Sequence, residues 1–323
     1  MKKMIKQVPC FILALCMVVL CFSGCGEKKD DTYTVGICQL VQHEALDAAT
    51  NGFKQALKDK LGDKVKFDEQ NASGEPTNCT TICSKFVSDK VDLIMANATG
   101  ALSAAAQATA DIPIVATSIT DYATALDISN WTGKTGFNVT GTADLAPLDE
   151  QAKMIKELVP TAKTVGILYC SAEPNSKYQS TVIQKSLKDL GFTCKEYTFV
   201  DTNDVTAVTQ QAALECDVIF APTDNTVASN GPAINNVLEP AKIPLIAGEE
   251  GICKKAGVAT LSISYYDIGY KAGEMAYQIL VEGADPAEME IEYAKNLTKK
   301  YMADRCKTLG ITIPEGYEAI SAE

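Results

Sequence analysis

The sequence contains little of what catalysis or nucleic-acid binding usually requires. His43 is its only histidine, so it can supply neither a multi-histidine metal site nor more than one histidine to a catalytic triad. Lys and Arg number 29 against 41 Asp and Glu, and the formal charge of −12 argues against a nucleic-acid partner. After Phe22 no apolar run is long enough to span a membrane. We expect no metal and no other cofactor.

The first 24 residues have the features of an export signal. Three lysines precede an apolar run from Val8 to Phe22, which is short for a spanning helix. The run ends in Ser23-Gly24-Cys25, which resembles a lipobox, although Phe22 stands where leucine is usual. We expect residues 1–24 to be removed, the Cys25 thiol to carry lipid, and 25–31 to form a tether on the extracytoplasmic face of the membrane. Secretion without a lipid is the alternative.

Cysteine is abundant, with twelve in the chain and eight of them after Cys25. Several occupy positions where a strand or helix would bury a small apolar side chain, and a free thiol packs well there. A chain of 323 residues corresponds to about two domains, which need no disulfides for stability. We expect few disulfides or none.

Three short segments recur in the same order, which indicates an internal duplication. The first segment of each pair reappears 125 to 131 residues later: 34–37 at 164–167, 92–96 at 217–221, and 112–116 at 243–247. Each is a short apolar run of strand type, and the stretches between them have the apolar spacing of helices. The pattern predicts two similar α/β halves.

Alternating strands and helices of this kind form parallel sheets covered on both faces. We therefore predict two doubly wound α/β lobes, the first over 32–140 and the second over 141–264. A further helical pattern within 265–323 indicates that part of this C-terminal crossover segment returns to the first lobe. More than one crossover would form a hinge, and two lobes around a hinge enclose a cleft.

The loops that follow the predicted strands should face this cleft, because ligands bind at the carboxyl ends of parallel strands. These loops contain hydroxyls, amides and carboxylates but no Lys or Arg, which disfavours phosphate and favours a zwitterion. Thr99, Ser118 or Ser176 could help to bind a carboxylate, and Asp224 could pair with an ammonium. The alternative for Thr99, Ser176 and Asp224 is helix capping. Gln42 and Glu249 lie in the same set of loops, and Glu249 also suits a helix start.

Several segments resemble those of one family: 42–47, Asn97-Ala98-Thr99, 138–141, 222–226, 247–251 and 265–269. The family is the ABC-transporter substrate-binding lipoproteins of the tryptophan- and tyrosine-binding type. The resemblance implies a type I periplasmic-binding-protein fold and capture of a small solute, often an aromatic amino acid, for an ABC permease and its ATPase. We expect the protein to be a monomer. It also implies that Asp224 and Thr99 contact the ligand, followed by Asn175, Ser176 and Asn225. Glu44 and Gly100 depart from the family, where proline is common.

Three other functions remain open from the sequence. The same fold could serve as a sensor that reports its ligand to a receptor, or it could bind a nucleoside or a sugar. The third is a racemase that uses Cys38 and Cys170, which follow equivalent strands of the two halves and could face each other across the cleft. Such thiols need a lowered pKa, and the loops offer no cation to lower it. We therefore expect a binding protein and no enzyme.

Overall fold

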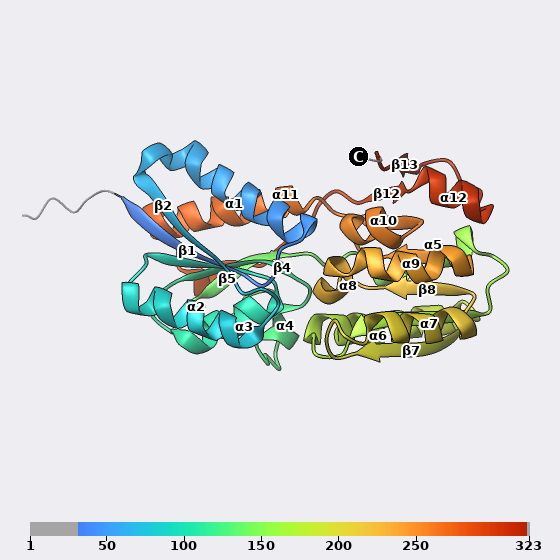
Figure 1. Cartoon of the computed structure of the whole chain (residues 1–323). Coiled ribbons are helices and arrows are strands. Elements are labelled where there is room, and N and C mark those ends of the chain that lie inside the picture. The colour runs from blue at the N-terminus through green and yellow to red at the C-terminus, as the bar shows by residue number, and fades with distance from the viewer. Residues whose placement is uncertain (1–31, 322–323) are drawn as a thin grey trace, which may run out of the picture. The chain divides into compact units, whose positions relative to one another are not determined.

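A computed structural model describes residues 32–321 (Figure 1). The predicted signal, the tether and Cys25 lie outside these residues. Residues from Tyr33 onward form one compact unit that contains two sheets, each covered by helices. Within the described range no helix is both long enough and apolar enough to cross a membrane.

The first sheet has the strand order β11-β5-β4-β3-β1-β2, and all its paired strands are parallel. We call this sheet with its helices lobe 1, which comprises residues 33–143 and 265–293. Its strands are β1 (Tyr33–Gln39), β2 (Val65–Asn71), β3 (Leu93–Asn97), β4 (Ile114–Ile119), β5 (Val139–Ala143) and β11 (Glu292–Tyr293). Its helices are α1 (Glu44–Leu61), α2 (Pro76–Asp89), α3 (Thr99–Ala108), α4 (Tyr122–Ala125) and α11 (Tyr265–Tyr277), with short turns η1 (Gly62–Lys64), η2 (Gln278–Glu282) and η3 (Pro286–Glu288).

The second sheet has the order β13-β12-β10-β9-β8-β6-β7. We call it with its helices lobe 2, residues 148–262 and 298–319. Its strands are β6 (Thr164–Cys170), β7 (Thr193–Phe199), β8 (Val218–Ala221), β9 (Leu245–Ala247), β10 (Ala259–Ser262), β12 (Thr298–Tyr301) and β13 (Glu318–Ala319). Its helices are α5 (Leu148–Leu158), α6 (Pro174–Asp189), α7 (Val205–Glu215), α8 (Asn225–Ser229), α9 (Gly231–Ala241), α10 (Glu250–Ala256) and α12 (Ala303–Leu309). β10 pairs with β12 in antiparallel fashion. The chain leaves lobe 2 at the end of β10 and returns from lobe 1 directly into β12, so the two strands run in opposite directions.

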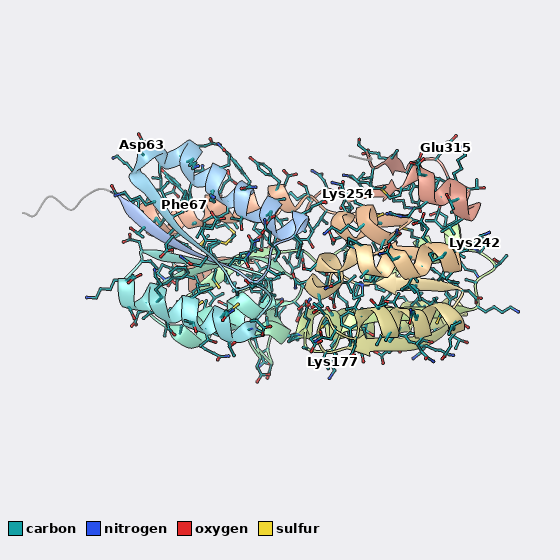
Figure 2. All side chains as sticks on the ribbon, viewed as in Figure 1. Asp63, Phe67, Lys177, Lys242, Lys254 and Glu315 are labelled. Carbon is teal, nitrogen blue, oxygen red and sulfur yellow. The ribbon has the colours of Figure 1, made fainter. Side chains whose placement is uncertain are left out.

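Apolar side chains fill the space on both faces of each sheet. In lobe 1, Val35 and Ile37 of β1 pack with α1 and α11, whereas Cys38 lies on the other face with Phe86 of α2. Charged side chains such as Asp63 and Lys242 project from the surface (Figure 2). A strand buried on both faces is typical of a doubly wound parallel sheet. The predicted class of two parallel-sheet α/β lobes is confirmed.

The duplicated segments have the same local structure in the two lobes. In lobe 1 the Asp92 carboxylate accepts a hydrogen bond from the Thr34 N–H at 2.7 Å. In lobe 2 the Asp217 carboxylate accepts one from the Thr164 N–H at 2.9 Å. Each aspartate therefore ties the start of the first strand of its lobe, β1 or β6, to the residue before the neighbouring strand, β3 or β8.

Three segments join the lobes: residues 144–147, 263–264 and 294–297. The boundary expected at 140/141 falls inside β5, so the chain leaves lobe 1 after Ala143. The C-terminal segment divides, with α11 and β11 in lobe 1 and β12 to β13 in lobe 2. Helix α11 lies tightly against α1 at Gly269. A Cβ atom at this position would come 2.0 Å from the Ala49 carbonyl oxygen, so the close approach requires glycine.

Candidate functional site

The strand ends of both lobes surround a small cavity of about 20 Å³. The lining residues from lobe 1 and the first crossover are His43, Leu46, Ser118, Thr120, Asp144 and Tyr265. Those from lobe 2 are Asn175, Thr223, Asp224, Asn225, Ala228 and Glu249. Among these described residues there is no lysine and no arginine. The cavity therefore combines carboxylates, hydroxyls and amides from both lobes without a fixed cation in its wall.

The structure brings most of the predicted residues together. Those that line the cavity are Ser118, Asn175, Asp224, Asn225 and Glu249. Ser176 lies behind them, fully buried, where its hydroxyl accepts a hydrogen bond from the Asn175 amide at 3.2 Å. Thr99 is buried at the start of α3 and does not line the cavity, and Gln42 is exposed.

Asp224 caps helix α8. Its carboxylate oxygens accept from the Val227 N–H at 2.8 Å and from the Cys170 N–H at 2.7 Å. Burial raises the pKa of this carboxyl well above its ordinary value, and the nearby Glu173 charge raises it further. Asp224 therefore has the capping role that the sequence left open, and it also lines the cavity.

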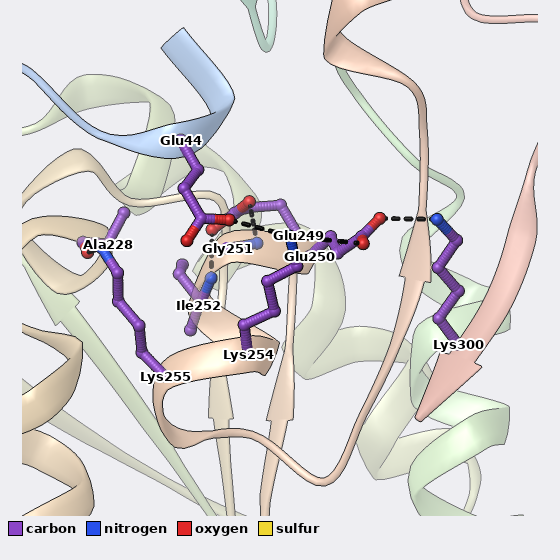
Figure 3. Close-up of polar contacts among 9 residues, drawn as sticks. All are labelled: Glu44, Ala228, Glu249, Glu250, Gly251, Ile252, Lys254, Lys255 and Lys300. Atoms are coloured by element: carbon purple, nitrogen blue, oxygen red, sulfur yellow. Dashed lines mark hydrogen bonds and ion pairs between the residues drawn. The ribbon is translucent and has the colours of Figure 1, made fainter. Parts of the chain in front are cut away.

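Glu249 plays the same part at the start of α10. Its oxygens accept from the Gly251 N–H at 2.6 Å and from the Ile252 N–H at 2.5 Å (Figure 3). Burial raises the pKa of Glu249 to about 7, although the two N–H groups and the Lys255 charge lower it. The Lys255 ammonium itself donates to the Ala228 carbonyl oxygen at 2.8 Å. The starts of α8 and α10 are thus already occupied by carboxylates of the chain.

Asp144 and Thr120 are site residues that the sequence reasoning missed, and Asp144 also contacts Tyr265. Asp144 lies in the first crossover, where its carboxylate accepts from the Tyr265 hydroxyl at 2.8 Å and the Thr120 hydroxyl at 3.1 Å. Burial raises the pKa of Asp144. The signal was present, because Asp144 follows a buried strand as the other site residues do. A boundary placed at 140/141 removed that strand from the list of strand ends.

Two hydroxyls at the cavity have no hydrogen-bond partner among the described residues. They belong to Ser118, at the end of β4, and Thr223, just after β8, and both are buried. Ser118 also has a φ of 58°, which is uncommon for a residue other than glycine. A buried polar group without a partner is unfavourable, and such groups concentrate where a ligand binds. Each lobe therefore contributes to the cavity lining one residue with an unsatisfied hydroxyl.

A larger pocket of about 360 Å³ adjoins the cavity, and Glu249 and Tyr265 line both. Its two lysines form ion pairs with glutamates: Lys300 contacts Glu250 at 2.6 Å, and Lys254 contacts Glu44 at 3.0 Å (Figure 3). The Lys254–Glu44 pair also joins α10 of lobe 2 to α1 of lobe 1. Because the smaller cavity holds the unpartnered hydroxyls, it is the better candidate for the ligand site.

The hypothesis that Cys38 and Cys170 face each other across the cleft is wrong. Cys38 lies in the core of lobe 1 beside Cys79 and Cys83, and Cys170 lies in the core of lobe 2. Hydrogen bonds to the two neighbouring thiols, with burial, raise the pKa of Cys38, and burial raises that of Cys170. Neither thiol lines the cavity, and neither has the low pKa of a nucleophile. All eight described cysteines are free thiols.

Comparison with known proteins gives the family. A sequence model described as ABC transporter substrate binding protein matches residues 34–323. This chain belongs to that family. Proteins of this family bind a small ligand outside the cytoplasm and deliver it to an ABC permease. Their lobes match the two-lobed type I periplasmic-binding-protein fold predicted from the sequence.

Relatives of this substrate-binding protein include one named for its ligand. A tyrosine-binding protein of Clostridioides difficile is 36% identical over 302 residues, which is 90% of this chain and 87% of the relative. Among solved structures, an ABC domain from Streptococcus pneumoniae in complex with L-Trp has a TM-score of 0.85 and 31% identity, covering 90% of this chain and 100% of the other. The first relative is named as a binding protein, and the second is described in complex with an amino acid.

A third relative of this substrate-binding protein was solved without a ligand. A ligand-free, open structure of a Clostridium difficile substrate-binding protein is 35% identical and covers 90% of this chain and 100% of the other. Its TM-score is only 0.69, against 0.85 for the L-Trp complex. The present structure therefore superposes more closely on the L-Trp complex than on the ligand-free, open structure.

Proposed function

We propose that this protein is a lipid-anchored receptor that binds an aromatic amino acid between its lobes for uptake by an ABC importer. The observation that carries the proposal is the agreement between two relatives above 30% identity. One is named for tyrosine, and the other contains L-Trp in a structure that superposes closely on this one. The protein acts by binding alone, and no bond is made or broken.

The charges around the cavity support a ligand with an ammonium group. Asp144, Asp224 and Glu249 all line it, and burial raises the pKa of each. Buried carboxylates are stable as anions when a positive charge lies near them. A ligand ammonium would supply that charge. Asp144 is the carboxylate most available to it, because two rotatable hydroxyls bind its oxygens whereas backbone N–H groups hold those of Asp224 and Glu249.

The ligand carboxylate requires hydrogen-bond donors. The N-termini of α8 and α10 already bind Asp224 and Glu249. The unpartnered hydroxyls of Ser118 and Thr223 remain, one in each lobe. A carboxylate placed between them would satisfy both lobes only when these approach each other, and the ligand would then favour the closed form.

The size of the cavity requires that the lobes open before a ligand enters. About 20 Å³ accommodates roughly one water molecule. An aromatic amino acid is far larger, so the lobes must separate and then close less tightly around it. The open and ligand-bound relatives support such a motion in this family.

Attachment to the membrane rests on the sequence alone. The apolar run that ends in Ser23-Gly24-Cys25 supports acylation of Cys25. Mass spectrometry of the mature N-terminus checks it, and a free or absent Cys25 would contradict it.

Thermal unfolding of the purified protein, freed of bound ligand, tests the ligand class. Tyrosine, phenylalanine and tryptophan are compared with other amino acids, nucleosides and sugars. A ligand at 100 times its dissociation constant should add about 2.7 kcal/mol of stability. We expect the aromatic amino acids alone to raise the midpoint.

Asp144→Asn should reduce this shift, and Asp149→Asn, a matched change on the exposed face of α5, should preserve it. A shift with a nucleoside or sugar only would contradict the ligand class while leaving the fold and family intact.

A further inference from the structure

Glu173 makes an unusual number of contacts for a residue outside the cavity wall. It precedes α6 and is half-buried. One carboxylate oxygen accepts from the Thr226 N–H at 2.9 Å and the Thr226 hydroxyl at 2.8 Å. The other accepts from the Asn225 N–H at 3.0 Å, the Asn225 side-chain amide at 2.7 Å and the Asn175 amide at 3.2 Å. Five donors therefore converge on this carboxylate.

These contacts determine which way the Asn225 amide points. A carboxylate only accepts, so the Asn225 Nδ2 must face Glu173, and its Oδ1 must face away. That Oδ1 lies 3.2 Å from the Nε2 of His43. Because an amide oxygen also only accepts, His43 must carry a proton on Nε2.

This contact joins the two lobes. His43 immediately precedes α1 in lobe 1 and is only 8% exposed, whereas Asn225 begins α8 in lobe 2. Both residues line the cavity, and Glu173 does not. When the lobes separate, the pair must part.

We propose that Glu173 is a positioning residue for closure: it orients the Asn225 amide so that Asn225 Oδ1 receives the His43 Nε2–H when the lobes close. Without this constraint the amide can turn and present its NH₂ group to the His43 N–H, which places donor against donor. Glu173 thereby stabilises the closed form without touching the ligand. This inference rests on the proposed function only in that ligand binding and closure occur together.

Glu173→Gln tests the proposal, because a glutamine places an NH₂ group among donors and leaves some of them unpaired. Loss of the interlobe hydrogen bond should weaken binding of L-tyrosine about 3- to 10-fold. Glu196→Gln is the matched control. Glu196 is also in lobe 2 and accepts from Tyr169 and Ser180, but these contacts do not reach lobe 1. It should leave the affinity unchanged.

The single histidine provides a readout that general destabilisation would not change. In untagged, ¹⁵N-labelled protein every imidazole signal comes from His43. With L-tyrosine bound, wild type and Glu196→Gln should show the Nε2–H tautomer with a slowly exchanging proton. Glu173→Gln should lose both features. Retention of both in Glu173→Gln would overturn the proposal.

A double-mutant comparison shows whether Glu173 acts through His43. In a His43→Ala background, Glu173→Gln should weaken L-tyrosine binding by less than twofold further. A full additional loss would overturn the proposal. If wild type binds neither L-tyrosine nor L-tryptophan, the proposed function fails. The imidazole signal of the ligand-free protein then decides about Glu173: slow exchange that Glu173→Gln abolishes supports the proposal, and an unchanged signal refutes it.

Discussion

Replacing Ser118 with alanine should separate stability from ligand binding. The Ser118 hydroxyl is buried at the cavity and has no partner among the described residues. Leaving such a group unsatisfied costs about 1–3 kcal/mol. Alanine removes the hydroxyl and keeps the Cβ atom, so any backbone strain at φ 58° is unchanged. The free energy of unfolding should therefore rise. We expect the low end of that range, about 1 kcal/mol, because water can hydrate the hydroxyl when the lobes open.

The same change should weaken the ligand. If the hydroxyl binds the ligand carboxylate, its loss removes a hydrogen bond worth about 0.5–1.5 kcal/mol, a factor of about 2 to 13 in affinity. Urea denaturation and calorimetric titration with L-tyrosine measure the two effects. Thr260→Val is the control, because the Thr260 hydroxyl is also buried and unpartnered but lies in β10, away from the cavity. It should raise stability and leave affinity unchanged. A Ser118→Ala protein that is less stable and binds tyrosine normally would refute the reasoning.

Three further changes have expected outcomes. Asp224→Ala leaves two buried N–H groups unpaired and should lower the free energy of unfolding by about 1–3 kcal/mol in urea; an unchanged value would show that the cap is dispensable. Because the pKa of Glu249 is raised from 4.5 to about 7, its contribution to stability is complete below pH 4.5 and is lost as the pH rises through 7. Wild type should lose about 3 kcal/mol more than Glu249→Gln between pH 4.5 and 8, and parallel profiles would contradict this. Gly269→Ala places a Cβ 2.0 Å from the Ala49 carbonyl oxygen and should reduce the melting temperature sharply. Gly100→Ala, whose Cβ would meet only a leucine side chain at 3.3 Å, should not.

The two lobes could be predicted from the sequence because the duplicated segments form the same structural contact in each lobe. Asp92 and Asp217 each hold the start of the first strand of a lobe, β1 or β6, so the motif marks the same place twice. The antiparallel strand β12 escaped prediction because strand direction depends on the route of the third crossover, which no local pattern records.

The candidate site could be predicted only in part from the sequence. The rule that ligands bind at strand ends located the right loops, but it does not state which side chain of a loop turns inward. Thr99 is buried in lobe 1 and Gln42 faces solvent, whereas Ser118 reaches the cavity. Asp144 was missed because the boundary predicted at 140/141 removed β5 from the strand ends that were considered, and its hydrogen bond to Tyr265 joins segments far apart in the sequence.

Calorimetric titration with L-tyrosine and with its amine-free analogue, 3-(4-hydroxyphenyl)propionate, tests the central claim most directly. The claim is that buried carboxylates, without lysine or arginine among the described residues that line the cavity, bind the ammonium of an aromatic amino acid. A charged hydrogen bond worth about 1.5–3 kcal/mol predicts that tyrosine binds at least about tenfold more tightly than the analogue. Equal affinities, or no binding of tyrosine, would contradict it.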